Sequence, residues 1–424
     1  MRKIKLTAGL LAGVLLAGCG SKISDEGSVM RTEEVTTTTS AVTEQVTTTV
    51  TTVETTTTTK KKKPKKPKIE YSYDDTLEVY QKVTIGDWLA DSTVTPDNAD
   101  ELVPTDKAGV FELTVKFGGE EKTLKYSVAD TTPPQFIYCP SVITVHQGSG
   151  FDPNVNIGFG DNYDKAPVVS FEGNVDTKTV GDYDIILTLK DSSGNTTRKT
   201  AVVSVVETLP QGRTDIPKSD FGDFKERYAV DGADVGIDVS YWQGDIDFNA
   251  VKNAGCSFVF IRAAHHSDSI YPDENFTKNI EGASNAGLDV GVYFYSSCSS
   301  PEEAREHAQW VIDKLGGREL QLPIAFDWES FDRFQRFGMS IHDLNLCYDA
   351  FREVIEENGY KAVLYSSKAF LESFWEDDNS REVWLAHYAE ETDYEGMYSY
   401  WQQGLCTISG INGDVDADVR YAKA

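Results

Sequence analysis

About 190 residues at the C-terminal end, from residue 231 to residue 424, alternate short apolar runs with stretches of helical periodicity. The apolar runs are rich in β-branched residues and are predicted strands: Val235–Val239, Phe258–Ala263, Val290–Tyr295, Pro323–Trp328, Ala362–Tyr365 and Val383–His387. The stretches between them are predicted helices: Phe248–Ala254, Asn275–Ala286, Glu302–Leu315, Ile341–Asn358 and Lys368–Trp375. Strand–helix alternation with continuous apolar strands predicts a parallel sheet covered by helices.

The number of strand–helix units limits the architecture. A regular eightfold α/β barrel typically uses about 250 residues, and fewer than eight full units fit into residues 231–424. We therefore predict an irregular or truncated α/β barrel of the TIM-like kind. In such a barrel the chemistry lies where strands end and loops begin.

The preceding segment, residues 69–208, has short strands separated by turns and no helical stretches between them. Alternating runs such as Val110–Phe117 and Asp184–Leu189 are separated by clusters of Gly, Asp, Asn and Pro. This strand–turn rhythm is typical of a β-sandwich. Gly109–Val115 also matches Gly181–Leu187 at an offset of 72 residues, which indicates an internal repeat.

The repeat resembles the tandem Ig-like domains of bacterial surface proteins. It predicts two small all-β sandwich domains, at 69–130 and 131–208, joined at the hinge Asp130–Pro134. Their expected role is spacing, with weak binding to wall or glycan as the alternative. Asp161 and Asp164 have the chemistry to bind calcium, but we favour a turn there.

The N-terminal end has the build of an export signal. A basic start is followed by an apolar stretch of only 11 residues, Leu6–Leu16. This stretch is too short to span a membrane as a helix. The end of residues 1–18, followed by Cys19, resembles the lipobox of bacterial lipoproteins. This resemblance implies a lipidated Cys19 and a protein anchored at the outer face of the bacterial membrane; an ordinary secretory signal is the alternative.

Residues 19–68 are rich in Thr and end in a Lys/Pro run, and they lack the apolar content needed for a core. We predict a disordered, extended linker there, and a second linker at 209–230. Either the lysines only keep this spacer solvated and extended, or they contact anionic lipids or wall polymers.

The charge argues against nucleic-acid binding, and the cysteine spacing argues against a cysteine metal site. The net charge is −28, with residues 1–68 at +6 and the rest at −34, so a nucleic-acid partner is not expected. Five cysteines remain after Cys19, with no metal-ligand spacing. We interpret them mostly as small buried residues, with one disulfide in the C-terminal half left open.

Carboxylates stand at the ends of two predicted strands. The first strand runs into Asp238, and the fourth ends in Asp327-Trp328-Glu329. Asp327 and Glu329 are two residues apart on a strand, so they point to one side and Trp328 to the other. Two neighbouring carboxyl groups push their pKa values apart, as glycoside hydrolysis requires of an acid and an ionised partner. The alternative is a solvated pair or a helix cap.

Eight motifs in order resemble glycoside hydrolase family 25, the Chalaropsis-type lysozymes. They are Gly-Ile-Asp-Val-Ser-x-x-Gln-Gly at 236–244, Phe-Val-Phe-Ile-Arg-Ala at 258–263, Gly-Val-Tyr at 291–293, Ile-Ala-Phe-Asp-Trp-Glu at 324–329, Leu-Tyr-Ser-Ser at 364–367, Trp-Leu-Ala-His-Tyr at 384–388, Tyr-Trp-Gln at 400–402 and Gly-Asp-Val-Asp at 413–416. The resemblance covers Val235 to the C-terminus.

The resemblance implies residue roles. Glu329 matches the general acid, Asp327 the carboxylate that steadies the substrate's acetamido group or the cationic centre, and Asp238 and Asp416 line the site. The implied substrate is peptidoglycan, cut at the β-1,4 bond between N-acetylmuramic acid and N-acetylglucosamine. No metal or cofactor is implied, and we expect a monomer.

Aromatic side chains at other strand ends are candidates for stacking on sugar rings, with barrel packing as the alternative for each. They are Tyr293, Tyr365, Trp384, Tyr388 and Trp401. The sequence departs from the family at Phe294, where many members have His, so a polar contact to the substrate is expected to be lost. Two rival functions stay open: a non-catalytic wall-binding or adhesion lipoprotein, and an enzyme acting on another N-acetylhexosamine polymer such as chitin.

Overall fold

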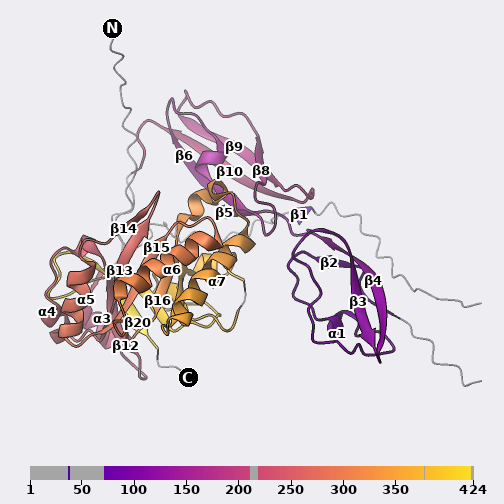
Figure 1. Cartoon of the computed structure of the whole chain (residues 1–424). Coiled ribbons are helices and arrows are strands. Elements are labelled where there is room, and N and C mark those ends of the chain that lie inside the picture. The colour runs from indigo at the N-terminus through magenta and orange to yellow at the C-terminus, as the bar shows by residue number, and fades with distance from the viewer. Residues whose placement is uncertain (1–36, 39–70, 211–217, 377, 422–424) are drawn as a thin grey trace, which may run out of the picture.

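The computed structural model describes residues 37–38, 71–210, 218–376 and 378–421 (Figure 1). The predicted signal peptide 1–18, Cys19 and nearly all of the linker 19–68 lie outside these residues. Within the described part of the chain, no helix has both the length and the apolar character needed to cross a membrane.

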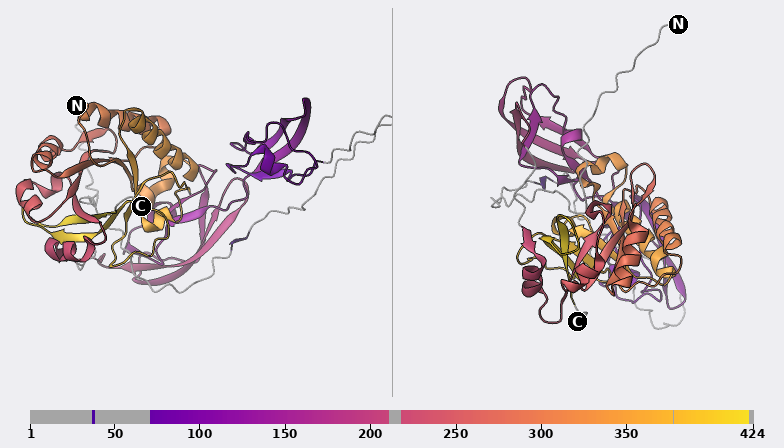
Figure 2. Two further views of the ribbon diagram at one scale, coloured as in Figure 1. Left: turned by 90° about the horizontal axis from the view of Figure 1, so that it is seen from below. Right: turned by 90° about the vertical axis from the view of Figure 1, so that its left-hand side faces the viewer.

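The C-terminal part is a closed barrel of eight strands, seen end-on in Figure 2. Its strands are β12 (Asp234–Val239), β13 (Phe258–His266), β15 (Asp289–Ser296), β16 (Ile324–Trp328), β17 (Ala362–Ser367), β18 (Val383–Ala386), β19 (Tyr400–Thr407) and β20 (Val415–Arg420). From β12 to β19 neighbours are parallel, and β20 closes the barrel by pairing antiparallel with both β19 and β12.

Of the two forms predicted, the structure has the irregular barrel, and the truncated one is wrong. The last two strands follow each other as an antiparallel pair, with only residues 408–414 between them and no helix. An antiparallel connection needs far fewer residues than a parallel crossover. Eight strands consequently fit into a segment that is too short for eight strand–helix units.

Helices surround the barrel as predicted from their periodicity (Figure 2). They are α4 (Phe248–Asn253), α5 (Phe276–Asn285), α6 (Pro301–Leu315), α7 (Ile341–Glu357) and α8 (Lys368–Leu371), the last shorter than expected. Outward residues of the strands pack against these helices in one large core. Inward residues form a separate aromatic core that includes Phe258, Phe260 and Tyr400. The alternation along each strand thus divides the domain into two layers.

The predicted linker 209–230 is partly structured, so the barrel domain begins earlier than residue 231. β11 (Lys218–Asp220) pairs parallel with β19, and α3 (Phe221–Tyr228) follows it. Asp220 caps α3 by accepting a hydrogen bond from the Gly222 N–H, 2.8 Å. Phe221 and Phe224, three residues apart, are buried in the outer core. The spacing of these two phenylalanines, about one helical turn apart, was the sequence signal for a helix that packs on the barrel.

The unit after the hinge is a β-sandwich. One sheet contains β6 (Val142–His146), β8 (Val168–Glu172), β9 (Gly181–Lys190) and β10 (Thr196–Val206), and the other pairs β5 (Gln135–Tyr138) with β7 (Gly158–Gly160). The short helix α2 (Pro153–Asn156) connects β6 to β7. Two residues of the predicted disordered linker, β1 (Thr37–Thr38), pair with the edge of β10. Threonine has high strand propensity, and an edge strand offers unpaired backbone groups.

The first unit repeats only part of this pattern. Its single sheet orders β2 (Thr76–Glu78), β4 (Glu120–Ala129) and β3 (Gly109–Phe117), with β2 parallel to β4 as β6 is to β10. A second sheet is not found in the described residues of this unit, where a sandwich was predicted. Helix α1 (Ile85–Trp88) buries Ile85 and Trp88 against the sheet instead.

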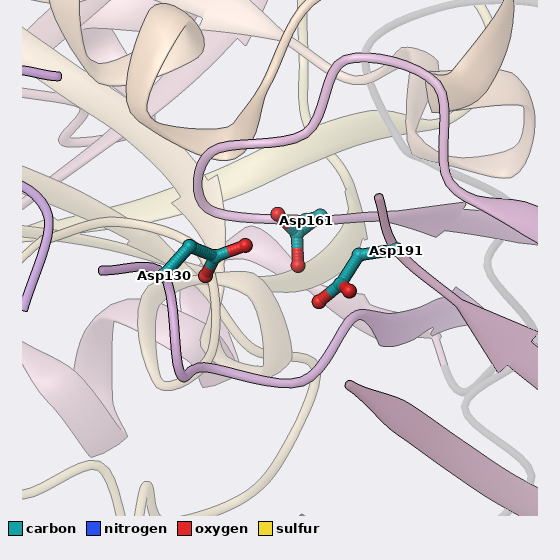
Figure 3. Close-up of side chains that lie close together, drawn as sticks. All are labelled: Asp130, Asp161 and Asp191. Carbon is teal, nitrogen blue, oxygen red and sulfur yellow. The ribbon is translucent and has the colours of Figure 1, made fainter. Parts of the chain in front are cut away.

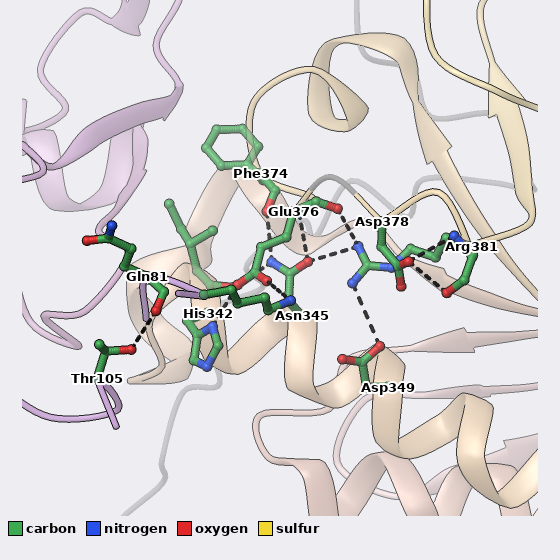
Figure 4. A network of polar contacts seen from close by, with 12 residues as sticks. Gln81, Thr105, His342, Asn345, Asp349, Phe374, Glu376, Asp378 and Arg381 are labelled. Carbon is green, nitrogen blue, oxygen red and sulfur yellow. Dashed lines mark hydrogen bonds and ion pairs between the residues drawn. The ribbon is translucent and has the colours of Figure 1, made fainter. Parts of the chain in front are cut away.

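The first unit contacts the barrel through α7. Tyr80 stacks on His342, with ring centroids 3.6 Å apart, and His342 Nδ1 lies 2.6 Å from Glu376. Behind them, the buried Asn345 accepts from the Glu376 N–H and from Arg381, at 2.9 and 3.0 Å (Figure 4). This network fixes the loop after α8 to α7.

The five cysteines from Cys139 onward are all free thiols. The disulfide left open by the sequence is therefore not formed in this structure. Cys256, Cys298, Cys347 and Cys406 are buried, as expected for small apolar side chains.

Truncating Phe224 tests whether α3 belongs to the barrel domain. Phe224→Ala leaves a cavity in the outer core, so we expect the free energy of unfolding to fall by about 3 kcal/mol or more. Denaturant unfolding of the full chain, followed by tryptophan fluorescence, measures it. The exposed neighbour change Glu226→Ala should have almost no effect; equal effects of the two changes would show that α3 contributes nothing to the core.

Candidate active site

Five carboxyl groups meet inside the barrel, toward the carboxyl ends of its parallel strands. Asp238 comes from β12, Asp327 from β16, Glu329 from the residue after β16, and Asp416 and Asp418 from β20. All are buried except Glu329, which is partly accessible. The structure therefore brings together the four acids named from the sequence and adds a fifth, Asp418.

The alternation predicted for Asp327-Trp328-Glu329 is confirmed. Trp328 is fully buried on the outer side, where its ring packs against Phe331 and its indole N–H donates to the Cys298 carbonyl, 3.0 Å. Because neighbouring side chains on a strand point to opposite faces, this anchor holds both acids on the inner face.

The environment of Glu329 differs from that of a glutamate in water. Burial raises the pKa of Glu329 to about 7, with the neighbouring Tyr365 hydroxyl opposing the shift and the negative charge of Asp238 adding to it. A carboxyl group with this pKa is partly protonated at neutral pH, whereas an ordinary glutamate is fully ionised.

Asp327 has a different environment. Burial raises the pKa of Asp327 well above its usual range, and the charges of Glu329 and Asp238 act in the same direction. The Arg262 guanidinium opposes this shift. Arg262 itself is held by Asp273, whose carboxylate accepts from Arg262 Nε at 3.0 Å and from the Tyr241 N–H at 2.9 Å. Arg262 is thus a fixed cation beside the acids.

A chain of hydrogen bonds orients Asp238. Gln402 Nε2 donates to Asp238 Oδ2 at 2.8 Å, and the Tyr365 hydroxyl donates to Gln402 Oε1 at 2.9 Å. Gln402 lies on β19 and is buried. Its amide links the acid on β12 to the tyrosine on β17 across the barrel.

The two aspartates of β20 are two residues apart, so both point inward. Asp416 accepts from the Tyr388 hydroxyl, and Asp418 accepts from Trp384 Nε1 at 2.9 Å. Burial and the charge of Asp238 raise the pKa values of both aspartates well above the usual range. The pKa values of Asp327, Glu329, Asp416 and Asp418 are all raised, because full ionisation of these groups would bury several like charges together.

The aromatic candidates divide by their position. Tyr293, Tyr365 and Trp384 are buried in the inner core, so they pack inside the barrel next to the acids. Tyr388 is 38% exposed and turns its hydroxyl toward Asp416, which places it at the rim. Trp401 lies in the outer core and donates its indole N–H to the His387 carbonyl, 2.8 Å. Because Trp401 alternates with the inward Gln402, it faces away from the acids. The prediction that Trp401 stacks on a sugar ring is therefore wrong.

The expectation for Phe294 also changes. Phe294 is fully buried in the outer core and stacks on His307, with ring centroids 4.6 Å apart. A side chain at this position does not face the barrel interior, so its departure from the family pattern removes no substrate contact here.

Sequence reasoning missed three residues among the acids, Arg262, Gln402 and Asp418, and also the exposed Trp242. Asp418 and Gln402 could have been predicted, because each lies two residues from another inward residue on the same strand. Trp242 is 41% exposed in η1 (Tyr241–Gln243), directly after the strand that carries Asp238. An exposed tryptophan beside an inward acid is a signal for ligand binding.

The segment after Glu329 packs against the β-sandwich. This segment, η2 (Ser330–Phe337), approaches β7 so closely that a Cβ added to Gly158 would lie 2.2 Å from the Phe331 carbonyl oxygen. Gln335 Nε2 donates to the Asn154 and Ile157 carbonyls at 2.9 and 3.1 Å. The sandwich therefore supports the loop that begins with Glu329.

Comparison with known families assigns the barrel and the second β unit, while the Ig-like domain predicted at 69–130 stays a prediction. Residues 237–404 match the model for glycosyl hydrolases family 25, and residues 139–205 match the Ig-like domain of bacterial surface proteins. The chain thus carries a family 25 glycosyl hydrolase domain behind a bacterial surface Ig-like domain. The family resemblance read from the eight motifs is confirmed for this part of the chain.

Individual relatives are similar over the barrel domain. The autolytic lysozyme of Clostridium acetobutylicum is 28% identical over 193 residues, which are 43% of this chain and 54% of that protein. Lysozyme M1 of Streptomyces globisporus is 27% identical over 195 residues, which are 43% of this chain and 65% of that protein. This chain therefore spans less than two thirds of either relative. A solved family 25 glycosyl hydrolase from Bacillus anthracis has 23% identity and a TM-score of 0.39, covering 45% of this chain and 89% of that one.

The raised pKa of Glu329 predicts how stability depends on pH. Its folded pKa of about 7 exceeds its ordinary value, so its contribution is full at acidic pH and is lost as pH rises from about 4.5 through 7. Glu329→Gln should therefore match the parent's melting temperature near pH 4 and exceed it at pH 8. The exposed control Glu319→Gln should show no such trend. A constant difference between Glu329→Gln and the parent across this range would contradict the assignment.

Proposed function

We propose that this chain is a muramidase that hydrolyses the β-1,4 bond between N-acetylmuramic acid and N-acetylglucosamine in peptidoglycan. The observation that carries the proposal is the pair Asp327 and Glu329 on the inner face of a family 25 barrel, with the pKa of Glu329 raised to about 7. The similarity to two lysozymes supports the same activity.

Glu329 acts as the general acid in this proposal. Its carboxyl proton passes to the glycosidic oxygen as the bond to the anomeric carbon breaks. Partial exposure leaves it accessible to a substrate, while burial and the charge of Asp238 raise its pKa, so that part of it keeps the proton at neutral pH. Such a group has its proton available where an ordinary glutamate has lost it.

Asp327, Asp238 and Asp416 stabilise the substrate as positive charge develops on the sugar ring. Asp327 lies beside Glu329 and steadies the acetamido group or the cationic centre. Gln402 holds Asp238 in one orientation, and Tyr388 does the same for Asp416. Fixed carboxylates need no reorganisation when charge develops, which is the main advantage of a preorganised site.

Exposed aromatic rings at the rim bind the glycan. Tyr388 and Trp242 are both more than a third exposed and lie on loops that follow strands carrying or contacting the acids. Sugar rings stack on such faces, because their axial C–H groups are apolar while the hydroxyl groups stay solvated.

The proposal extends to location. Cys19 is lipidated, and residues 19–68 form an extended tether on the outer face of a bacterial membrane. The observations behind this part are the lipobox-like end of residues 1–18 and the Thr-rich and Lys/Pro-rich composition that follows. The β units then carry the barrel into the wall. Labelling of cells with a radioactive fatty acid, with Cys19→Ala as control, tests the anchor.

Digestion of purified peptidoglycan tests the activity. The full chain should release new reducing ends that are N-acetylmuramic acid, and Glu329→Gln should lower the rate about 10²- to 10⁴-fold because it cannot donate a proton. Glu319→Gln is the matched control and should keep the parental rate. Tight binding without new ends would support a non-catalytic wall-binding protein. Cleavage of chitin alone would assign the other N-acetylhexosamine substrate.

The pH dependence of the reaction gives a separate prediction. Because Glu329 must be protonated, kcat/KM should fall as pH rises through about 7, the pKa of that group in the free protein. Initial rates of peptidoglycan solubilisation between pH 4 and 9 measure this limb. A rate that still increases between pH 7 and pH 9 would exclude Glu329 as the acid.

A further inference from the structure

Three aspartates meet far from the barrel acids, where the two β units join. Asp130 follows β4 in the hinge, Asp161 follows β7, and Asp191 lies in the turn between β9 and β10. Each offers a carboxylate oxygen, and these oxygens all lie within 4.8 Å of one another (Figure 3). The three side chains come from separate loops and point toward a common centre.

All three carboxylates are buried, and two of their oxygens have no partner. Asp161 is 0% exposed, and its Oδ2 atom accepts no hydrogen bond. Asp130 is 6% exposed, and its Oδ1 atom accepts no hydrogen bond either. No lysine or arginine among the described residues forms an ion pair with any of the three. Burying carboxylates without a positive partner is strongly unfavourable.

Turn formation accounts for only some of these oxygens. Asp161 Oδ1 accepts from the backbone N–H groups of Tyr163 and Asp164, at 2.9 and 2.6 Å, as the turn expected from the sequence requires. Asp164 also stays outside the cluster and accepts from the Ala166 and Ser192 N–H groups. The remaining oxygen of Asp161 faces the other two aspartates and is not explained by the turn.

We propose that Asp130, Asp161 and Asp191 bind a divalent cation, and that this cation is calcium. The oxygens are hard ligands, and no His or Cys belongs to the cluster, so the set does not fit zinc. Calcium accepts six to eight oxygens in flexible geometry, which suits ligands from three loops better than the strict octahedron of magnesium. The side-chain oxygen of Asn162, the residue after Asp161, is buried and accepts no hydrogen bond either.

The electrostatics agree with this site. Burial raises the pKa of Asp161 to about 7 and that of Asp130 to about 6; the charges of Asp130 and Asp191 add to the shift of Asp161, and that of Asp191 adds to the shift of Asp130. A bound cation replaces this repulsion with attraction.

The ion would connect three parts of the molecule. Asp130 ends the first unit, while Asp161 and Asp191 belong to the Ig-like domain. The backbone carbonyl of Asp161 accepts from the Ile341 N–H at 2.7 Å, and Lys165 pairs with Asp343 at 2.9 Å, so the same loop contacts the start of α7. A cation at this junction restricts the hinge between the β units and holds both against the barrel.

Calcium titration of the full chain, after treatment with a chelator, tests the site. Calorimetry should show one ion bound with Kd between about 10⁻⁴ and 10⁻³ M, the range of extracellular calcium modules. At calcium near 100 times Kd, the unfolding equilibrium constant should fall about 100-fold. Asp161→Asn and Asp191→Asn should each weaken binding at least tenfold, whereas Asp182→Asn, an exposed acid of the same domain, should leave it unchanged.

The chelated state separates loss of binding from misfolding. Without calcium, Asp161→Asn removes one of three repelling buried charges, so it should melt at or above the temperature of the parent. With calcium, the parent should become the more stable protein. The proposal is overturned if about 10 mM calcium gives neither binding heat nor a change in melting temperature. Unchanged affinity in both aspartate variants, or preferred binding of magnesium or zinc, overturns it equally.

Discussion

The burial of Trp328 on the outer face of β16 is the contact on which the proposed chemistry depends. Its ring is packed among phenylalanines and its indole N–H is satisfied by the Cys298 carbonyl. Since the strand alternates, fixing Trp328 outward fixes Asp327 and Glu329 inward. Apolar packing of Trp328 on the outer face thus keeps two carboxyl groups buried on the inner face, although their burial is unfavourable.

Charge burial is the source of the unusual acids. In water these five carboxyl groups would all be ionised at neutral pH, and their differences would be small. Inside the barrel, desolvation and mutual repulsion raise the pKa values of Asp327, Glu329, Asp416 and Asp418. Gln402, Arg262 and the tyrosine hydroxyls supply the polar contacts that make this burial tolerable. Sites of this kind are where catalytic acids are expected.

The β units are more than a spacer placed before an independent barrel. The Ig-like domain packs on η2, the segment that starts directly after Glu329, and the first unit stacks Tyr80 on α7. Their junction also holds three buried aspartates with unsatisfied oxygens. The domain that was expected to act as a spacer, or to bind wall or glycan weakly, therefore also supports the loop after Glu329.

The sequence by itself determined the repeating elements, the family and the four acids, because strand and helix periodicity and ordered motifs are local properties of the chain. Most barrel strands lie within a few residues of their predicted ends. Only the tertiary structure decided that β20 closes the barrel antiparallel, that β11 pairs with β19, and that Trp401 faces outward. It also brought Asp130, Asp161 and Asp191 together. These outcomes depend on pairing and packing between segments far apart in the chain, and no local pattern encodes which of them meet.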